Sequence, residues 1–285
     1  MWMLFAFLSA VFAALTSIFA KIGIKDVDSN LATALRTVVV LAMAWLMVLI
    51  TGSLDGIRVI SGHTMLFLIL SGLATGASWL CYFKAISLGD VNKVAPIDKS
   101  STILTMILAF ILLGEGFSPV AGIGMALMFI GTMLMIERKD IERKDEKPSW
   151  IVYAVLSAVF AALTSILGKI GIEGVDSNLG TAIRTCVVLA MAWMIVFMQG
   201  TWKQAGNVGR RNGGFLILSG LATGASWLCF YRALQGGPAS LVVPIDKLSI
   251  LFTVLFAVII LKEKMSGKSW SGLALLVVGT FMLLL

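Results

Sequence analysis

The sequence contains the same unit twice. Shifting it by 148 positions superimposes residues 1–137 on residues 149–285 without a gap, and about half of the paired residues are identical. The block SAVFAALTSI, for example, occurs unchanged at 9–18 and at 157–166. The chain therefore consists of two copies of one structural unit, and a charged connector over residues 138–148 joins them.

Each copy is a series of long apolar runs. With 59% apolar residues, 13% charged residues and a mean hydropathy of +0.99, the chain is too apolar for a water-soluble domain. The runs have about 18 to 23 residues, enough for a helix to cross a hydrocarbon core of about 30 Å. We predict an all-α integral membrane protein with ten transmembrane helices, over residues 3–22, 31–50, 64–85, 92–113, 119–136, 151–170, 179–198, 212–233, 242–261 and 267–284.

The number of spans determines how the copies are oriented. Each copy has five spans, an odd number, and the connector is too short to cross the bilayer again, so the second copy must enter from the opposite face. Lys and Arg collect on the cytoplasmic face of membrane proteins. Once the equivalent pairs Lys21/Lys169 and Lys84/Arg232 are set aside, thirteen basic loop residues lie on one face and one on the other. We predict two inverted five-helix repeats, a cytoplasmic connector and both termini outside.

Charged residues inside the apolar runs indicate where a functional site lies. Asp98 and Lys99, repeated as Asp246 and Lys247, fall within the fourth span of each copy. A charge near the bilayer centre costs roughly 2.5 to 3.5 kcal/mol, so it needs a partner or water. In inverted copies the two carboxylates come within roughly 6 Å of the same depth. This predicts a midplane site between the repeats.

Two prolines next to these charges leave two interpretations open. If the helices begin near Asp90 and Pro238, then Pro96 and Pro244 each remove a backbone donor inside a helix and free carbonyls to face a cavity, as in discontinuous transporter helices. If the helices begin later, each proline is a first-turn residue, the aspartate complements the helix dipole and the lysine reaches the headgroups.

Arg36 and Arg184, in the second span of each copy, are the predicted partners of the aspartates, and a structural ion pair is favoured over a substrate role. Adjacent residues project about 100° apart on a helix, so Asp98 and Lys99 are poorly placed to pair. Lys169, at the end of the first span of copy two, is expected to anchor its helix at the interface.

Aromatic residues in the third spans offer a wall for a cavity. Trp79 and Trp227 lie deep in these spans, and Tyr82 and Tyr231 lie near the helix ends. Amphipathic rings of this kind supply an apolar surface with polar tips. An aromatic belt at the membrane surface, or plain packing, explains the same pattern.

Glycines and glutamates are interpreted structurally. Small-xxx-small spacing at Gly72 and Gly76, repeated in copy two, and the pair Gly124/Gly131 with its equivalent Gly272/Gly279 predict closely packed helices. Glu115 and its equivalent end the fourth spans, where a solvated carboxylate is expected.

An enzyme is disfavoured. His63 is the only histidine and has no repeat partner, and neither HExxH nor GxSxG occurs. The three cysteines lie in apolar runs without paired spacing. We predict no catalytic residues, no metal site and no cofactor.

The repeated motifs resemble the EamA group of the drug/metabolite transporter superfamily. The resemblance rests on a first helix that ends AKIGI or GKIGI, a third helix with LATGASWLC, and a fourth helix that begins APIDK or VPIDK and ends LGE or LKE. It implies a basket of ten helices around a central cavity lined by helices 1, 3, 4, 6, 8 and 9, and export of small metabolites or drugs by alternating access. Related small multidrug transporters carry an essential glutamate in the first helix, and this chain has none there.

The resemblance also sets the expected partners and location. We expect a small-molecule substrate, the lipid bilayer as the surroundings, and no nucleic acid, because the +7 net charge lies mostly in loops that set topology. A monomer in a prokaryotic plasma (inner) membrane is favoured, since the fused copies already supply both orientations. A flippase for a lipid-linked precursor and a non-transporting scaffold remain alternatives.

Overall fold

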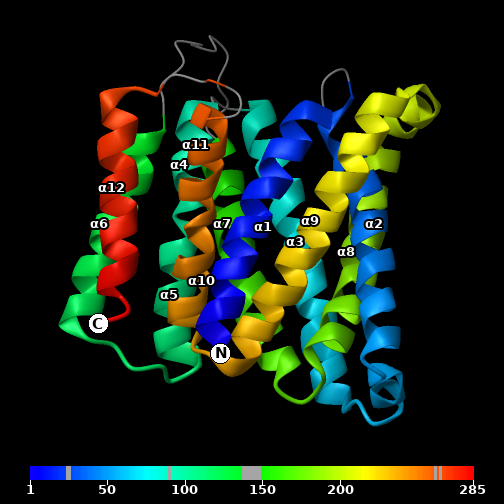
Figure 1. The fold of residues 1–285 in the computed structure, drawn as a ribbon, viewed down its shortest axis with the longest axis horizontal. Helices are drawn as coiled ribbons and strands as arrows, with labels where there is room; N and C mark the ends of the chain where they lie inside the picture. Colours follow the sequence, from blue (N-terminus) through cyan, green and yellow to red (C-terminus); the bar gives the residue numbers. More distant parts are fainter. Residues whose placement is uncertain (24–26, 89–90, 137–148, 260–261, 263–264) are drawn as a thin grey trace.

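The computed structural model describes residues 1–23, 27–88, 91–136, 149–259, 262 and 265–285, and in these residues every regular element is a helix (Figure 1). The connector therefore lies outside the described residues. The first copy forms α1 (Trp2–Gly23), α2 (Ser29–Ile50), the 3₁₀ helix η1 (Ser53–Arg58), α3 (Gly62–Leu88), α4 (Val91–Lys99), α5 (Ser101–Leu112) and α6 (Pro119–Met135). The second forms α7 (Trp150–Ile172), α8 (Ser177–Gln199), η2 (Thr201–Asn207), α9 (Arg210–Gly236), α10 (Ala239–Lys247), α11 (Ser249–Ile259) and α12 (Gly267–Met282).

Seven helical segments in the described chain are long and apolar enough to cross a membrane. They are α1, α2, α3, α7, α8, α9 and the segment Ala239–Phe256, which runs through α10 into α11. The prediction of an all-α, multi-pass membrane protein is confirmed. Seven is fewer than the ten predicted spans. The helices α6 and α12 have only 17 and 16 residues, and the predicted span 92–113 is divided between α4 and α5.

The repeated sequence VDSNL explains where two of the long helices begin. Asp28 accepts hydrogen bonds from the backbone N–H groups of Asn30 and Leu31, both at 3.0 Å. Asp176 caps α8 through the equivalent two N–H groups. Each aspartate thus satisfies donors that the first turn of a helix leaves without partners.

The two copies bury each other along most of their length. α1 packs against α9 and α3 against α7, and the 148-residue shift converts one of these contacts into the other. In Figure 1 the α6 and α12 pair stands at one edge of the molecule, the α2 and α8 pair stands near the other, and both termini lie at the lower edge. Because the main interfaces join elements of different copies, neither copy has a separate core.

Glycines permit the closest of these contacts. A Cβ added at Gly131 would lie 2.5 Å from the carbonyl oxygen of Gly272, and one added at Gly279 would lie 2.6 Å from that of Gly124. Since both obstacles are backbone atoms, no side-chain movement could relieve the overlap. The predicted packing role of these glycines is confirmed.

The fourth predicted span is interrupted in both copies beside its charged residues. α4 begins at Val91 and α10 at Ala239, so Pro96 and Pro244 lie inside helices, and the interpretation as first-turn prolines is wrong. The backbone N–H of Ser100 bonds to Ile97 and that of Leu248 to Ile245, three residues back, so the chain tightens before α5 and α11 begin. Each charged pair therefore ends a short helix and lies next to a break.

Replacing Gly131 by Ala should lower the free energy of unfolding by about 1 to 3 kcal/mol, because the methyl group forces α6 away from α12. Gly213→Ala in α9 is the control, since its Cβ meets no atom within 4 Å. Thermal unfolding in detergent, followed by size-exclusion chromatography, measures both variants. Equal midpoints would contradict the assigned contact.

Candidate functional site

A cavity of about 350 Å³ lies between the two copies. It is bounded by α1 and α3 of the first copy and by α7, α8, α9 and the short helix α10 of the second, and we call it the central cavity. Hydroxyl, aromatic and charged side chains all contribute to its wall. The lining residues are Ala13, Thr75, Ser78, Trp79, Ala161, Thr164, Ser165, Arg184, Ser226, Trp227, Phe230, Tyr231, Val243, Asp246 and Lys247.

Both predicted aspartates accept hydrogen bonds from the opposite copy. The hydroxyl of Ser9 donates to Oδ1 of Asp246 at 2.6 Å, and that of Ser157 donates to Oδ1 of Asp98 at 2.9 Å. Ser9 and Ser157 are equivalent in the repeat, as the aspartates are, so one interaction occurs twice. Sequence analysis missed these serines. Their signal was their place in the block SAVFAALTSI, which is identical in the two copies.

The two charged pairs differ in their surroundings. Asp246 and Lys247 line the central cavity, whereas Asp98 and Lys99 are absent from its wall. Nζ of Lys99 lies 3.7 Å from Oδ2 of Asp98, and these side chains are 51% and 20% exposed. The prediction that these neighbours are poorly placed to pair is therefore wrong, since they form an ion pair at the end of α4.

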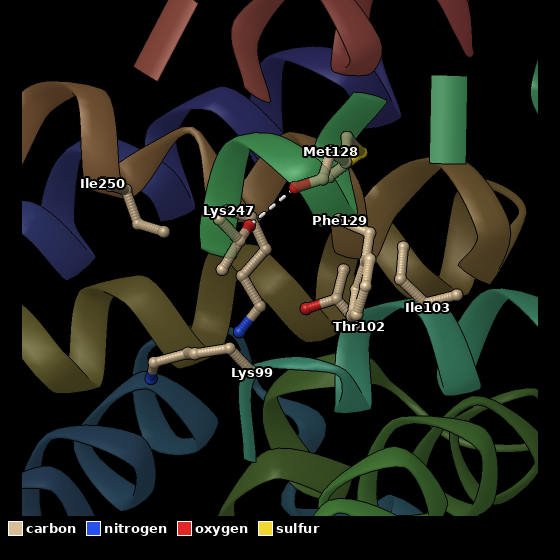
Figure 2. A pocket seen from close by; sticks show the side chains of 8 residues that line it. Lys99, Thr102, Ile103, Met128, Phe129, Lys247 and Ile250 are labelled. Carbon is tan, nitrogen blue, oxygen red and sulfur yellow. Dashed lines mark hydrogen bonds between the residues drawn. The ribbon is translucent and has the colours of Figure 1, made fainter. Parts of the chain in front are cut away.

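The two lysines share a second, smaller pocket, which Figure 2 shows. Lys99 comes from the end of α4 and Lys247 from the end of α10, and Thr102, Met128 and Phe129 help to close the space around them. Its volume is about 10 Å³, room for roughly one water molecule. Lys247 thus borders both this pocket and the central cavity.

Arg184 is the most enclosed charge at the site, at 2% exposure. Its Nε donates to the hydroxyl of Ser71 at 3.0 Å and its Nη2 to that of Thr75 at 2.6 Å. The rings of Trp227 and Tyr231 lie over the guanidinium, with centroids 5.1 and 4.8 Å from Cζ. The arginine is held by hydroxyls and by cation–π contacts.

Arg36 is held more loosely. Its Nη1 donates to the hydroxyl of Ser219 at 3.3 Å, and Arg36 does not line the central cavity. In the part of the chain that the structure describes, neither Arg36 nor Arg184 makes an ion pair with Asp98 or Asp246. The predicted arginine–aspartate pairs are wrong, since the guanidinium groups donate instead to serine and threonine hydroxyls on α3 and α9.

Three of the four aromatic residues predicted to line a cavity do so in the structure. Trp79, Trp227 and Tyr231 line the cavity. Tyr82 does not, and it packs instead beside buried Ala85 and neighbouring apolar residues. The 148-residue shift pairs Tyr231 with a phenylalanine, and pairs Tyr82 with Phe230, a lining residue that sequence analysis missed.

A polar clamp holds the loop between α9 and α10. Oε1 and Oε2 of Glu115 accept hydrogen bonds from the backbone N–H groups of Ala239 and Ser240, at 2.6 and 2.8 Å. The ammonium group of Lys169 donates to the carbonyl oxygens of Leu234 and Gly237 at the end of α9. Glu115 therefore caps α10 and is not a solvated carboxylate, and Lys169 bonds to carbonyl groups at the end of the neighbouring helix α9.

Comparison with known proteins identifies the family. The model of the EamA-like transporter family matches residues 1–137 and again residues 148–285. The chain belongs to the EamA-like transporter family. Membership implies a membrane transporter, and not an enzyme.

A relative and a solved structure support this assignment at different levels. The chain is 46% identical over 134 residues to a Sinorhizobium sp. protein described as an uncharacterized transporter in the cobO 3′ region, and the match covers 47% of this chain and 95% of that protein. The relative is therefore about as long as one EamA copy. A solved structure described only as a crystal structure of a protein matches with a TM-score of 0.78 and 18% identity, over 99% of this chain and 95% of that chain, which shows a shared fold.

Removing the cap at Glu115 should loosen α10. Glu115→Ala takes away the acceptors of two backbone N–H groups and is expected to cost about 0.5 to 2 kcal/mol of stability. Asp55→Ala, at an exposed carboxylate in η1, is the matched control and should leave the unfolding midpoint unchanged. The thermal midpoint in detergent is the measurement, and a shift in the control as large as that of Glu115→Ala would contradict the clamp.

Proposed function

We propose that this EamA-like transporter exports small metabolites or drugs by alternating access around the central cavity. The observation that carries the proposal is the position of the cavity, at the interface of the two copies, with side chains from both in its wall. Sites at repeat interfaces suit alternating access, because rocking of one repeat against the other opens the site to each side in turn.

We propose that the chain crosses a prokaryotic plasma (inner) membrane ten times, as two inverted five-helix repeats. Both termini then lie outside the cytoplasm, and the connector 138–148 lies on the cytoplasmic side. The odd number of predicted spans in each copy and the thirteen-to-one distribution of basic residues support this arrangement. Both termini lie at the same edge of the molecule in Figure 1, which agrees with an even number of membrane spans. The extensive contact between the fused copies favours a monomer.

The proposed substrate path runs past Asp246 and Lys247. Their short helix ends at a break, and such interrupted helices let polar backbone groups face a cavity at membrane depth. Arg184 and the aromatic side chains Trp79 and Trp227 complete the wall on the other helices. In the alternate state we expect the equivalent groups, Asp98, Lys99 and Arg36, to come closer to the path.

The transport test uses purified protein in liposomes and a panel of metabolites, with and without a pH gradient. Asp246→Asn should reduce the initial rate of uptake by at least about tenfold, since it alters a charge that lines the cavity. The single variant Asp98→Asn and the double variant extend the comparison, and exposed Asp55→Asn is the control. Normal transport by the double variant would show that neither aspartate is needed for transport, although the protein would still be a transporter.

The inverted arrangement is tested with equivalent positions. Asp55 in η1 and Lys203 in η2 are equivalent under the 148-residue shift, and both are exposed. After Cys81, Cys186 and Cys229 are replaced by alanine, Asp55→Cys should react with a membrane-impermeant maleimide in intact cells, and Lys203→Cys only after permeabilisation. Labelling of both from the same side would overturn the inverted repeats.

A further inference from the structure

We infer that the central cavity binds a small organic monocarboxylate, with its acid group at Arg184 and its apolar body against the aromatic wall. The inference rests on the proposed function, because it names the class of solute that the same cavity would carry. Three independent features of the cavity support it: its charge balance, the coordination of Arg184, and the composition of its wall.

The cavity wall has an excess of one positive charge. The charged side chains that line it are Arg184, Lys247 and Asp246. Asp246 already accepts a short hydrogen bond, 2.6 Å, from Ser9. Charges at membrane depth are costly unless they are compensated, so a solute with a single negative charge is the complement of this wall.

Arg184 has donor capacity that the protein does not use. Nε and Nη2 bond to Ser71 and Thr75, both neutral hydroxyls. Nη1 is buried and has no hydrogen-bond acceptor among the residues that the structure describes. A buried donor left without an acceptor is rare and needs an explanation. A solute carboxylate supplies both the acceptor and the opposite charge, and the planar guanidinium suits this group geometrically.

The aromatic wall is adjacent to this guanidinium. Trp227 and Tyr231 lie over Arg184, and Trp79 and Phe230 extend the apolar surface. The volume of about 350 Å³ lies in the range of sites for small organic molecules. The rings therefore favour a flat apolar body attached to the acid. The Trp227 and Tyr231 rings cover Arg184 in this structure, so binding involves an adjustment of one of these side chains.

Other solute charges fit this wall less well. An organic cation would meet Arg184 and Lys247 together and would compete with Ser9 for the single carboxylate. A dianion such as a phosphate monoester would bring one negative charge more than the wall can balance. A neutral amide could occupy the volume and accept from Nη1, but it would leave the net charge uncompensated.

The test compares four probes built on one ring: phenylacetate, phenylacetamide, phenethylamine and phenyl phosphate. Isothermal titration of the purified full-length protein should give phenylacetate a Kd at least about tenfold lower than each of the other three, as expected for one charge-assisted hydrogen bond. Equal or tighter binding of phenethylamine or phenyl phosphate would overturn the inference. Failure of all four probes to bind at millimolar concentration would do the same.

Variants locate the acid group. Arg184→Gln should raise the Kd for phenylacetate by at least about tenfold, with Arg184→Lys between it and the wild type. Arg211→Gln, at an exposed position in α9, should leave that Kd unchanged. Thermal unfolding shows whether each variant is folded. If the Arg184 variants are not, the wild-type probe series decides alone, and a folded Arg184→Gln protein with unchanged affinity would overturn the inference.

Liposome transport separates this inference from the proposed function. Uptake of amines or neutral solutes, with no competition by phenylacetate, would leave the transporter intact and remove the carboxylate site. Tight phenylacetate binding without uptake of any solute in the panel would retain the site and remove the transport function.

Discussion

Polar groups inside this protein depend on partners within the chain, because hydrocarbon offers neither donors nor acceptors. The structure meets this requirement mainly across the interface between the copies. Ser9 bonds to Asp246 and Ser157 to Asp98, and the threonine pairs Thr16–Thr223 and Thr75–Thr164 meet at 3.2 Å. In each of these four contacts the two residues belong to different copies. Packing of the two copies and satisfaction of the buried polar groups are therefore the same event.

The central cavity follows from this interface. Glycines bring α6 against α12 by backbone contact, and Gly72 and Gly220 let α3 and α9 approach the second helix of the opposite copy. The tryptophans Trp79 and Trp227 and the long side chains of Arg184 and Lys247 form part of the cavity wall. The clamp from Glu115 and Lys169 holds the loop that leads into α10, so the helix bearing Asp246 has a defined start.

Equivalent residues do not have equivalent environments. Arg184 is buried between two aromatic rings and two hydroxyls, whereas Arg36 has one long hydrogen bond. Asp246 borders the cavity and Asp98 does not. Part of the difference is in the sequence, since Tyr231 has a phenylalanine as its counterpart. The rest is a property of the conformation, because the same residue types occupy both sets of positions.

The sequence by itself determined the duplication and the helical membrane class, because residue identity between the copies, span length and hydropathy can be read directly from the chain. It left open whether Pro96 and Pro244 lie inside a helix, and the helix starts in the structure decided that they do. It also singled out Asp246, Lys247, Trp79 and Trp227 by their unusual depth, and all four line one cavity. The partners of these groups were decided by tertiary structure alone. Arg184 bonds to hydroxyls and packs against rings, and not against an aspartate, and Glu115 caps a helix of the other copy. These hydrogen bonds join positions more than 100 residues apart. No local pattern encodes which helices become neighbours, and that choice depends on how the two copies pack.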